Sequence, residues 1–243
     1  EIFQELPLVE YILVPIGGGG LATGVSTLAK LLNPKIKVIG VEPSGAACMK
    51  ASLEQGEVVT LPHVNTIADG TAVQTPGEHI FPYLQENLDD VITIDDDELI
   101  VAFLDMVENH KMIVENSGLL TVAALRHLNF TGKKVVSILS GGNMDVITMS
   151  SVVQHGLIQR DRIFTVSVLI PDKPGELVRV ASIIAENQGN VIKLDHNQFI
   201  STNRYAAVEL KVTLEAYGTD HKKKIVKALE EAGCKPKIIR ANL

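Results

Sequence analysis

The chain has 243 residues, 46% of them hydrophobic, and a formal net charge of −7 at pH 7. That length allows one or two domains with a sizeable hydrophobic core. The acidic balance argues against nucleic-acid binding, because the longest basic run is the triplet at 222–224 on a predicted helix face. Cys48 and Cys234 are far apart, which fits a reducing cytoplasm better than a disulfide framework.

An uncharged stretch covers residues 11–29, a length that approaches a membrane span. Pro15 and four consecutive glycines make a membrane helix unfavourable there, and a strand, a turn and a helix explain the stretch better. We therefore expect no membrane partner, no secretory leader and a cytoplasmic location.

The first part of the chain alternates predicted strands and helices. The predicted strands are 11–16, 37–41 and 134–139, and the predicted helices are 22–32, 97–110 and 119–128. Apolar strands separated by helices are typical of a parallel sheet covered on both faces. Three strands make a narrow sheet, and the chain begins without a methionine inside a predicted helix. We therefore expect it to be the C-terminal piece of a longer protein.

The join between the first strand and the first helix is a run of glycines, Gly17, Gly18, Gly19 and Gly20. Without Cβ atoms, their N–H groups can point into one concavity, and the helix that follows adds unpaired amides and a positive dipole end. The spacing matches neither the dinucleotide nor the P-loop pattern. We expect a phosphate cradle, and the alternative is a flexible turn.

A second glycine-containing turn, Ser140-Gly141-Gly142-Asn143, follows the strand predicted at 134–139. Ligands of parallel sheets bind beyond the carboxyl ends of the strands, so both turns can face one crevice. The pair predicts a ligand with a phosphate at one end and a polar atom near the Ser140 hydroxyl. The alternative is a tight strand-to-helix turn.

Residues 150–162 look like a connector, and a different pattern follows them. The predicted strands are 163–170, 190–199, 205–214 and 235–240, with helices at 175–188 and 220–232. The order βαββαβ predicts an α+β, ferredoxin-like unit with both helices on one side of an antiparallel sheet.

Five segments of the first part, ILVPIGGGGLATGV, KVIGVEP, TIADGTAV, IVENSG and VVSILSGGNMD, occur in this order. They resemble the α/β fold-type II pyridoxal-phosphate enzymes, of the tryptophan synthase β-like fold, and most of all the threonine ammonia-lyases, with serine racemases as a sister group. The resemblance implies that Gly17–Gly20 and Leu21 hold the phosphate of pyridoxal 5'-phosphate. It also implies that Ser140, with Gly141 beside it, meets the pyridine nitrogen.

The resemblance also names residues that border the cleft and a possible cation site. Asp69, Glu115 and Asn116 are expected to line the cleft, although Glu115 could equally be a surface carboxylate at a helix start. Glu42 and Ala46 match positions where relatives bind a cation. The third ligand position is Cys48, and a thiol is a poor ligand for a hard cation.

The cofactor lysine of this family lies in a Ser-x-Lys-x-Arg-Gly segment before the tetraglycine, and the chain contains no such segment. A lysine that forms a Schiff base needs an apolar pocket that lowers its pKa, and none of the lysines present has an obviously apolar context. We expect no catalytic residue in this chain and no activity from the chain alone.

Residues 163–240 resemble an ACT domain, a small regulatory module of amino-acid metabolism. The resemblance implies an amino-acid effector bound near Asp172, Pro174, Gly175, Leu177 and Asn190, where helix amides suit a carboxylate. Such modules pair, which predicts a homodimer or homotetramer. The alternative is a dimerisation domain without a ligand.

The resemblance as a whole implies three segments: residues 1–150 as the C-terminal portion of a catalytic domain, 151–162 as a linker and 163–243 as an ACT domain. The implied activity is deamination of L-threonine, and of L-serine, to 2-oxobutanoate or pyruvate and ammonia, under allosteric control. The alternatives are a non-catalytic amino-acid sensor and a serine racemase or serine dehydratase.

Overall fold

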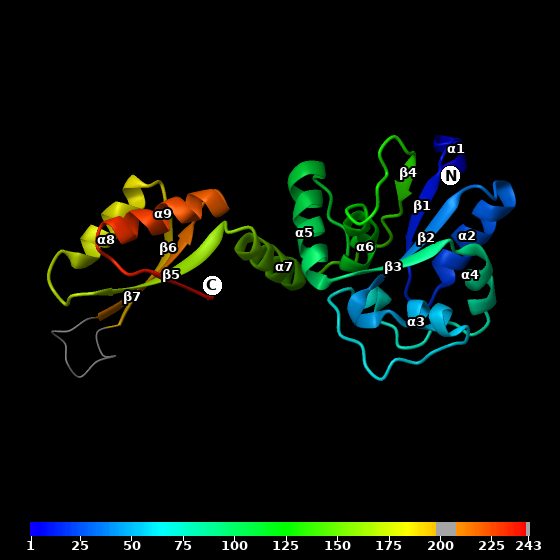
Figure 1. Ribbon diagram of the computed structural model, residues 1–243, viewed down its shortest axis with the longest axis horizontal. Helices are drawn as coiled ribbons and strands as arrows, with labels where there is room; N and C mark the ends of the chain where they lie inside the picture. Colours follow the sequence, from blue (N-terminus) through cyan, green and yellow to red (C-terminus); the bar gives the residue numbers. More distant parts are fainter. Residues whose placement is uncertain (198–207, 242–243) are drawn as a thin grey trace. The chain divides into compact units, whose positions relative to one another are not determined.

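The computed structural model describes residues 1–197 and 208–241 (Figure 1). The chain forms two compact units, Glu1–Val152 and Val153–Leu243. The expected strand residues at 198–199 and 205–207 lie outside the described residues. Within the described part of the chain, no helix is long and apolar enough to cross a membrane.

The first unit is built on a parallel sheet with the strand order β3-β2-β1-β4. The central strand β1 (Tyr11–Pro15) pairs with β2 (Lys37–Pro43) on one side and with β4 (Val135–Ser137) on the other. The predicted parallel sheet is thus confirmed. It contains one strand that we did not expect, β3 (Asp90–Ile94), which pairs with β2. Its apolar run is short and flanked by acidic residues, so the hydrophobic pattern there is weak.

Helices cover this sheet on both faces. Figure 1 shows α2 and α4 on one face and α5 and α6 on the other. The helices of the first unit are α1 (Ile2–Glu5), α2 (Gly20–Leu32), α3 (Cys48–Gln55), α4 (Phe81–Asn87), α5 (Asp96–Asp105) and α6 (Asn116–Ala124), and α7 (Val146–Gln159) starts in it. Single 3₁₀ turns lie at Ser44–Ala46 and Asp69–Thr71, and a π-helical segment, Met106–His110, continues α5. A core of fully buried side chains, including Ile12 and Val14 of β1 and Ala22 and Ala29 of α2, joins the helices to the sheet.

Residues 150–159, which we expected to form a connector, are helical and belong to α7. Asp145 starts this helix, because its Oδ1 accepts hydrogen bonds from the amides of Ile147 and Thr148, both at 2.9 Å. A side-chain acceptor at a helix N-terminus satisfies amides that the helix itself leaves unpaired. The division between the two compact units falls inside this helix, after Val152.

The second unit has the βαββαβ order of a ferredoxin-like fold. Its elements are β5 (Ile163–Ile170), α8 (Glu176–Glu186), β6 (Asn190–Asn197), β7 (Val208–Glu215), α9 (Thr219–Glu231) and β8 (Lys237–Ile239). The strands are antiparallel in the order β6-β7-β5-β8. Val180 and Ile184 of α8 and Ile225 and Leu229 of α9 are fully buried against one face of the sheet.

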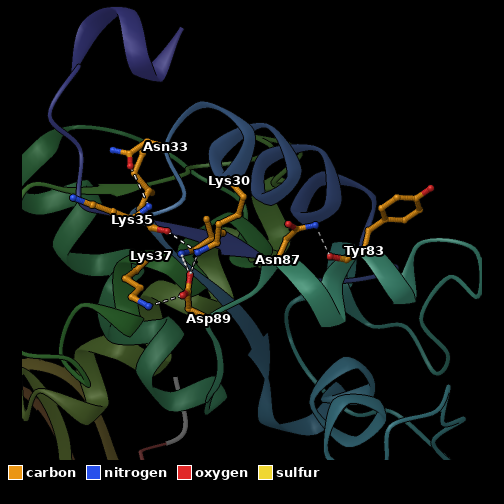
Figure 2. A network of polar contacts seen from close by, with 9 residues as sticks. Lys30, Asn33, Lys35, Lys37, Tyr83, Asn87 and Asp89 are labelled. Atoms are coloured by element: carbon orange, nitrogen blue, oxygen red, sulfur yellow. Dashed lines mark hydrogen bonds and ion pairs between the residues drawn. The ribbon is translucent and has the colours of Figure 1, made fainter.

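An ion-pair network fixes the edge of the first unit where β2 and β3 begin (Figure 2). Asp89 Oδ2 accepts from Lys30 Nζ at 2.6 Å and from the Val38 amide at 2.8 Å, and its Oδ1 accepts from Lys37 Nζ at 2.8 Å. Burial alone would raise the pKa of the Asp89 carboxyl, but these three donors outweigh it and lower the pKa below its ordinary value of 3.8. One carboxylate therefore joins α2, β2 and the approach to β3.

Replacing this carboxylate tests its contribution to stability. We expect Asp89→Asn to destabilise the first unit by about 1–2 kcal/mol at pH 7, since charge-assisted hydrogen bonds are lost and Lys30 remains half-buried. The folded pKa lies below the unfolded pKa, so this contribution is present above about pH 4 and is lost as the pH falls through the folded pKa. Calorimetric unfolding from pH 7 to pH 3 measures both effects.

The matched control is Glu57→Gln, because Glu57 is exposed and forms no ion pair within the described residues. A difference between Asp89→Asn and the unsubstituted chain that stayed constant down to pH 3 would contradict a stabilising charge at this position.

Candidate cofactor site

The glycine turn at the carboxyl end of β1 exposes a row of backbone amides. β1 is fully buried at Ile12–Val14, and the Ile16 amide still donates to Val41 O at 2.8 Å, so the sheet holds the turn at its start. The amides of residues 18–22 donate no hydrogen bond to any other described residue, and no side chain caps α2. Unpaired amides at the positive end of a 13-residue helix form an anion site.

The four glycines have two different functions in this turn. Gly19 has a left-handed φ of 99°, and an ideal Cβ on it would lie 2.7 Å from Ile80 Cδ1 and 2.8 Å from Leu84 Cδ1. Gly18 and Gly20, in contrast, face open space within the described structure. The backbone conformation therefore requires glycine at Gly19, whereas Gly18 and Gly20 leave room beside the unpaired amides. The turn fits a bound phosphate.

The short turn Asp69–Thr71 packs directly against the glycine run. An ideal Cβ on Gly17 would lie 3.1 Å from Gly70 O and 3.1 Å from Thr71 Cα. Gly70 in turn contacts the start of α6, where its ideal Cβ would lie 2.9 Å from Ser117 Oγ and 3.1 Å from Glu115 Oε1. Glycine contacts thus connect three loops at the carboxyl end of the sheet.

The Ser140–Asn143 turn reaches the same helix from the other side. Glu115 Oε2 accepts a hydrogen bond from the Asn143 amide at 3.0 Å. Gly141 has a φ of 82°, and any Cβ on it would overlap the Glu115 carboxylate. Glu115 is therefore half-buried beneath this turn and is not simply a surface carboxylate.

Ser140 itself lies next to α6. Its carbonyl oxygen is so close to Gly118 that a Cβ on residue 118 would overlap it. Its hydroxyl forms no hydrogen bond with any residue that the structure describes, so it is available to a ligand. β1 and β4 are adjacent and parallel, with Leu13 opposite Ser137, and the Ile138 amide donates to Leu13 O at 3.1 Å. The glycine run and Ser140 therefore follow neighbouring strands at the same edge of the sheet.

A pocket of about 330 Å³ lies beside these loops. Asp69, Glu115 and Asn116, the three cleft-lining candidates, all line it together with Asn143. Gly17–Gly20 and Ser140 are not part of its lining. Asn143 belongs to the Ser140-Gly141-Gly142-Asn143 motif, but the sequence predicts no function for it. Its amide bond to Glu115 joins residues 28 positions apart, and no local pattern signals that contact.

The candidate cation residues have a different arrangement. Glu42 is fully buried, and its Oε1 and Oε2 accept from the amides of Met49 and Lys50, both at 2.8 Å. Burial raises the pKa of Glu42 to about 7 and that of the Cys48 thiol to about 11. Ala46 is buried in the preceding turn. Among the described residues no group of three or more His, Cys, Asp or Glu could hold a metal. Glu42 instead caps α3, so these residues do not fit a hard cation.

The candidate effector residues lie in the second unit. Gly175 precedes α8 with a φ of 93° and open space around it, next to the exposed Asp172 and Pro174. Leu177 packs against the core of the unit. Asn190 Nδ2 donates to Glu215 Oε2 at 3.1 Å. The structure thus places Asn190 against β7, and no described hydrogen bond joins it to the Gly175 turn.

Residues 1–141 match the family of pyridoxal-phosphate dependent enzymes. The chain belongs to this family. An L-threonine ammonia-lyase from Geobacter sulfurreducens is 37% identical over 235 residues, which are 96% of this chain and 58% of that protein. The chain thus spans somewhat more than half the length of this relative.

Solved structures give the same result for the fold. The processed form of threonine deaminase isoform 2 from Solanum lycopersicum has a TM-score of 0.59 and 36% identity, covering 63% of this chain and 46% of that one. Serine racemase from Dictyostelium discoideum has a TM-score of 0.55 and 40% identity, covering 60% of this chain and 47% of that one. The family uses pyridoxal phosphate. The glycine turn and the Ser140 hydroxyl, which has no described partner, fit this cofactor.

A pair of glycine substitutions on α2 and its N-cap tests the strained turn. We expect Gly19→Ala to destabilise the first unit by about 1–2 kcal/mol, because alanine disfavours the left-handed φ of 99° while the contacting side-chain ends can shift. Gly24→Ala, in the same helix with open space and ordinary φ, should stabilise it by about 0.5–1 kcal/mol. Calorimetric unfolding of both variants measures this, and equal effects would contradict the assigned strain.

Proposed function

We propose that this chain forms part of a pyridoxal-phosphate-dependent enzyme that deaminates L-threonine to 2-oxobutanoate and ammonia, with L-serine as a secondary substrate. The observation that carries the proposal is the extent of the similarity to L-threonine ammonia-lyase, which covers 96% of this chain and therefore both units.

In this proposal the glycine turn binds the phosphate of the cofactor. The amides of residues 18–22 donate to the phosphate oxygens, and the dipole of α2 favours the negative charge. Ser140 offers its hydroxyl to the pyridine nitrogen without placing a charge there. When bound, pyridoxal phosphate supplies an electron sink beside the Cα of an amino acid.

Glu115 acts as a positioning residue for this arrangement. Its carboxylate accepts the Asn143 amide and fills the space that a side chain at Gly141 would occupy. The Ser140–Asn143 turn is therefore held against α6 from two sides, since Ser140 also contacts Gly118. A fixed turn keeps the Ser140 hydroxyl at one place relative to the neighbouring glycine run.

The amine that would hold the cofactor covalently is not assigned to any residue of this chain. The residues that line the pocket beside Glu115 include no lysine within the described structure. Lys30 and Lys37 are paired with Asp89, and Lys133 with Glu10. We therefore propose that the 243 residues alone bind the cofactor without turnover.

Serine racemase is the second candidate activity, since the racemase from Dictyostelium discoideum is 40% identical over the matched region. The solved structures do not separate the two activities, since threonine deaminase covers 63% and the racemase 60% of this chain. The sequence match to the ammonia-lyase, in contrast, extends over both units. The ferredoxin-like unit therefore favours the ammonia-lyase.

We further propose that the second unit is an ACT-type module that pairs with a second copy, in a homodimer or homotetramer, and binds a small aliphatic amino acid. Gly175 leaves the start of α8 open for a carboxylate, and Asp172 and Pro174 form the turn that precedes it. Leu177 offers an apolar surface, and Asn190 offers a polar group at the start of β6.

The activity is tested on the protein encoded by the gene, loaded with pyridoxal phosphate. We expect 2-oxobutanoate from L-threonine with a kcat/KM about 10-fold or more above that for pyruvate from L-serine, because a pocket shaped for the extra methyl group discriminates by that order. Chromatography of the keto acids and chiral analysis of serine measure the products. D-serine as the main product would favour the racemase, and no turnover of either substrate would favour a non-catalytic sensor.

Regulation is tested by thermal unfolding of the whole chain against the aliphatic amino acids. One of them should stabilise the second unit by about 2.7 kcal/mol at a hundredfold excess over its Kd. Asn190→Ala should reduce this stabilisation, and Lys224→Ala, an exposed position on α9, should not. If no amino acid raises the unfolding midpoint, the unit serves only for pairing.

A further inference from the structure

The pocket lined by Asp69, Glu115 and Asn116 contains a buried acceptor that lacks a donor. Asn116 is only 4% exposed, and its Nδ2 donates to Ile67 O at 2.9 Å. Its Oδ1 is buried, and no donor reaches it within the described residues. Buried carbonyl oxygens in proteins nearly always accept a hydrogen bond, so this atom calls for a donor from outside the chain.

The other acceptors of this pocket are also incompletely used. Asp69 is exposed, and its carboxylate accepts no hydrogen bond from any described residue. Glu115 uses Oε2 for the Asn143 amide, which leaves Oε1 available. Asp145 also lines the pocket, although its oxygens bind the start of α7. These acceptors suit a ligand that carries several N–H donors.

The charge of the pocket favours a cation. Three carboxylates line it, and the lining includes no lysine, arginine or histidine in the described part of the chain. The positive end of α6 opposes a cation, but a helix end carries about half a charge, and Glu115 stands at the N-cap of this helix. The net field inside the pocket is therefore negative.

The oxygen acceptors that line the pocket determine which kind of cation fits. A divalent metal takes six or more oxygen ligands, and no suitable cluster of His, Cys, Asp or Glu occurs among the described residues. A primary ammonium group carries three N–H donors and one positive charge. Three acceptors on a negative wall of a pocket of about 330 Å³ match that chemistry.

We propose that this pocket is a subsite for a primary ammonium group, in which Asn116 Oδ1 accepts one N–H and the Asp69 carboxylate supplies opposite charge. The group can come from the α-ammonium of an amino acid or from a free ammonium ion. The expected source rests on the proposed function, because deamination consumes the first and releases the second. The binding itself requires no cofactor.

The experiment uses the 243-residue chain without cofactor and follows the Asn116 side-chain amide by ¹⁵N–¹H NMR. Ammonium chloride and L-threonine are titrated separately. Tetramethylammonium chloride, potassium chloride and 2-hydroxybutanoate serve as probes that lack the ammonium N–H donors. We expect a saturable shift with ammonium chloride, L-threonine or both, and none with the three other probes. Saturation by L-threonine alone identifies an amino-acid subsite, and saturation by ammonium alone identifies a product subsite.

Two variants and one matched control test the residues. Asp69→Asn, at an exposed position that leaves the fold intact, should weaken binding at least fivefold, as should Asn116→Ala. In Asp69→Asn the Asn116 side-chain signal reports the binding, and in Asn116→Ala the backbone amides of the pocket report it. Thr27→Val should leave binding unchanged, because Thr27 Oγ1 is also buried without a described partner but lies on α2 outside this pocket.

An equal shift with tetramethylammonium or potassium, or unchanged affinity in both pocket variants, would overturn the inference. Absence of ammonium binding to the 243-residue chain, when the cofactor-loaded protein encoded by the gene forms 2-oxobutanoate from L-threonine, refutes the subsite alone. Ammonium binding to the 243-residue chain, when the cofactor-loaded protein encoded by the gene turns over neither threonine nor serine, refutes the proposed function alone.

Discussion

Loops at the carboxyl end of the parallel sheet approach one another most closely where a Cβ atom is missing. Gly17 lies against the carbonyl of Gly70, Gly70 lies against Glu115 and Ser117, and Gly141 lies against the Glu115 carboxylate. A Cβ at Gly141 would overlap the Glu115 carboxylate, whereas a Cβ at Gly17 or Gly70 would force the neighbouring atoms to shift. The glycine turn, the Ser140 turn and the neighbouring pocket are all shaped by this packing.

Two buried or half-buried carboxylates of the first unit bind backbone amides. Glu42 accepts hydrogen bonds from the Met49 and Lys50 amides in the first turn of α3, and Glu115 accepts one from the Asn143 amide. In both cases a carboxylate replaces water at amides that secondary structure leaves unpaired. This use removes Glu42 from the expected cation site and makes Glu115 a support of the cofactor turn.

The observations that support a function differ between the two units. The first unit matches the pyridoxal-phosphate family by sequence and fold, and its open amides and free Ser140 hydroxyl agree with that match. The second unit has a ferredoxin-like order of strands and helices. Its regulatory function is a proposal from the Gly175 turn and the relatives that share both units.

The amino-acid sequence by itself determined the elements whose signals are local. The apolar runs at β1, β2 and β5, the helical periodicity of α2, α8 and α9, and the glycine run identified both units and the family. Local signals did not predict β3, because acidic residues flank this five-residue strand and weaken its hydrophobic pattern. They also did not predict the helix at 150–159, which Asp145 starts. Only the tertiary structure decided that Glu115 lies beneath Gly141, that Glu42 caps α3, and that Asn116 retains an unused oxygen. These outcomes join residues far apart in the chain, and their energies depend on burial and on competing donors, which no pattern of neighbouring residues contains.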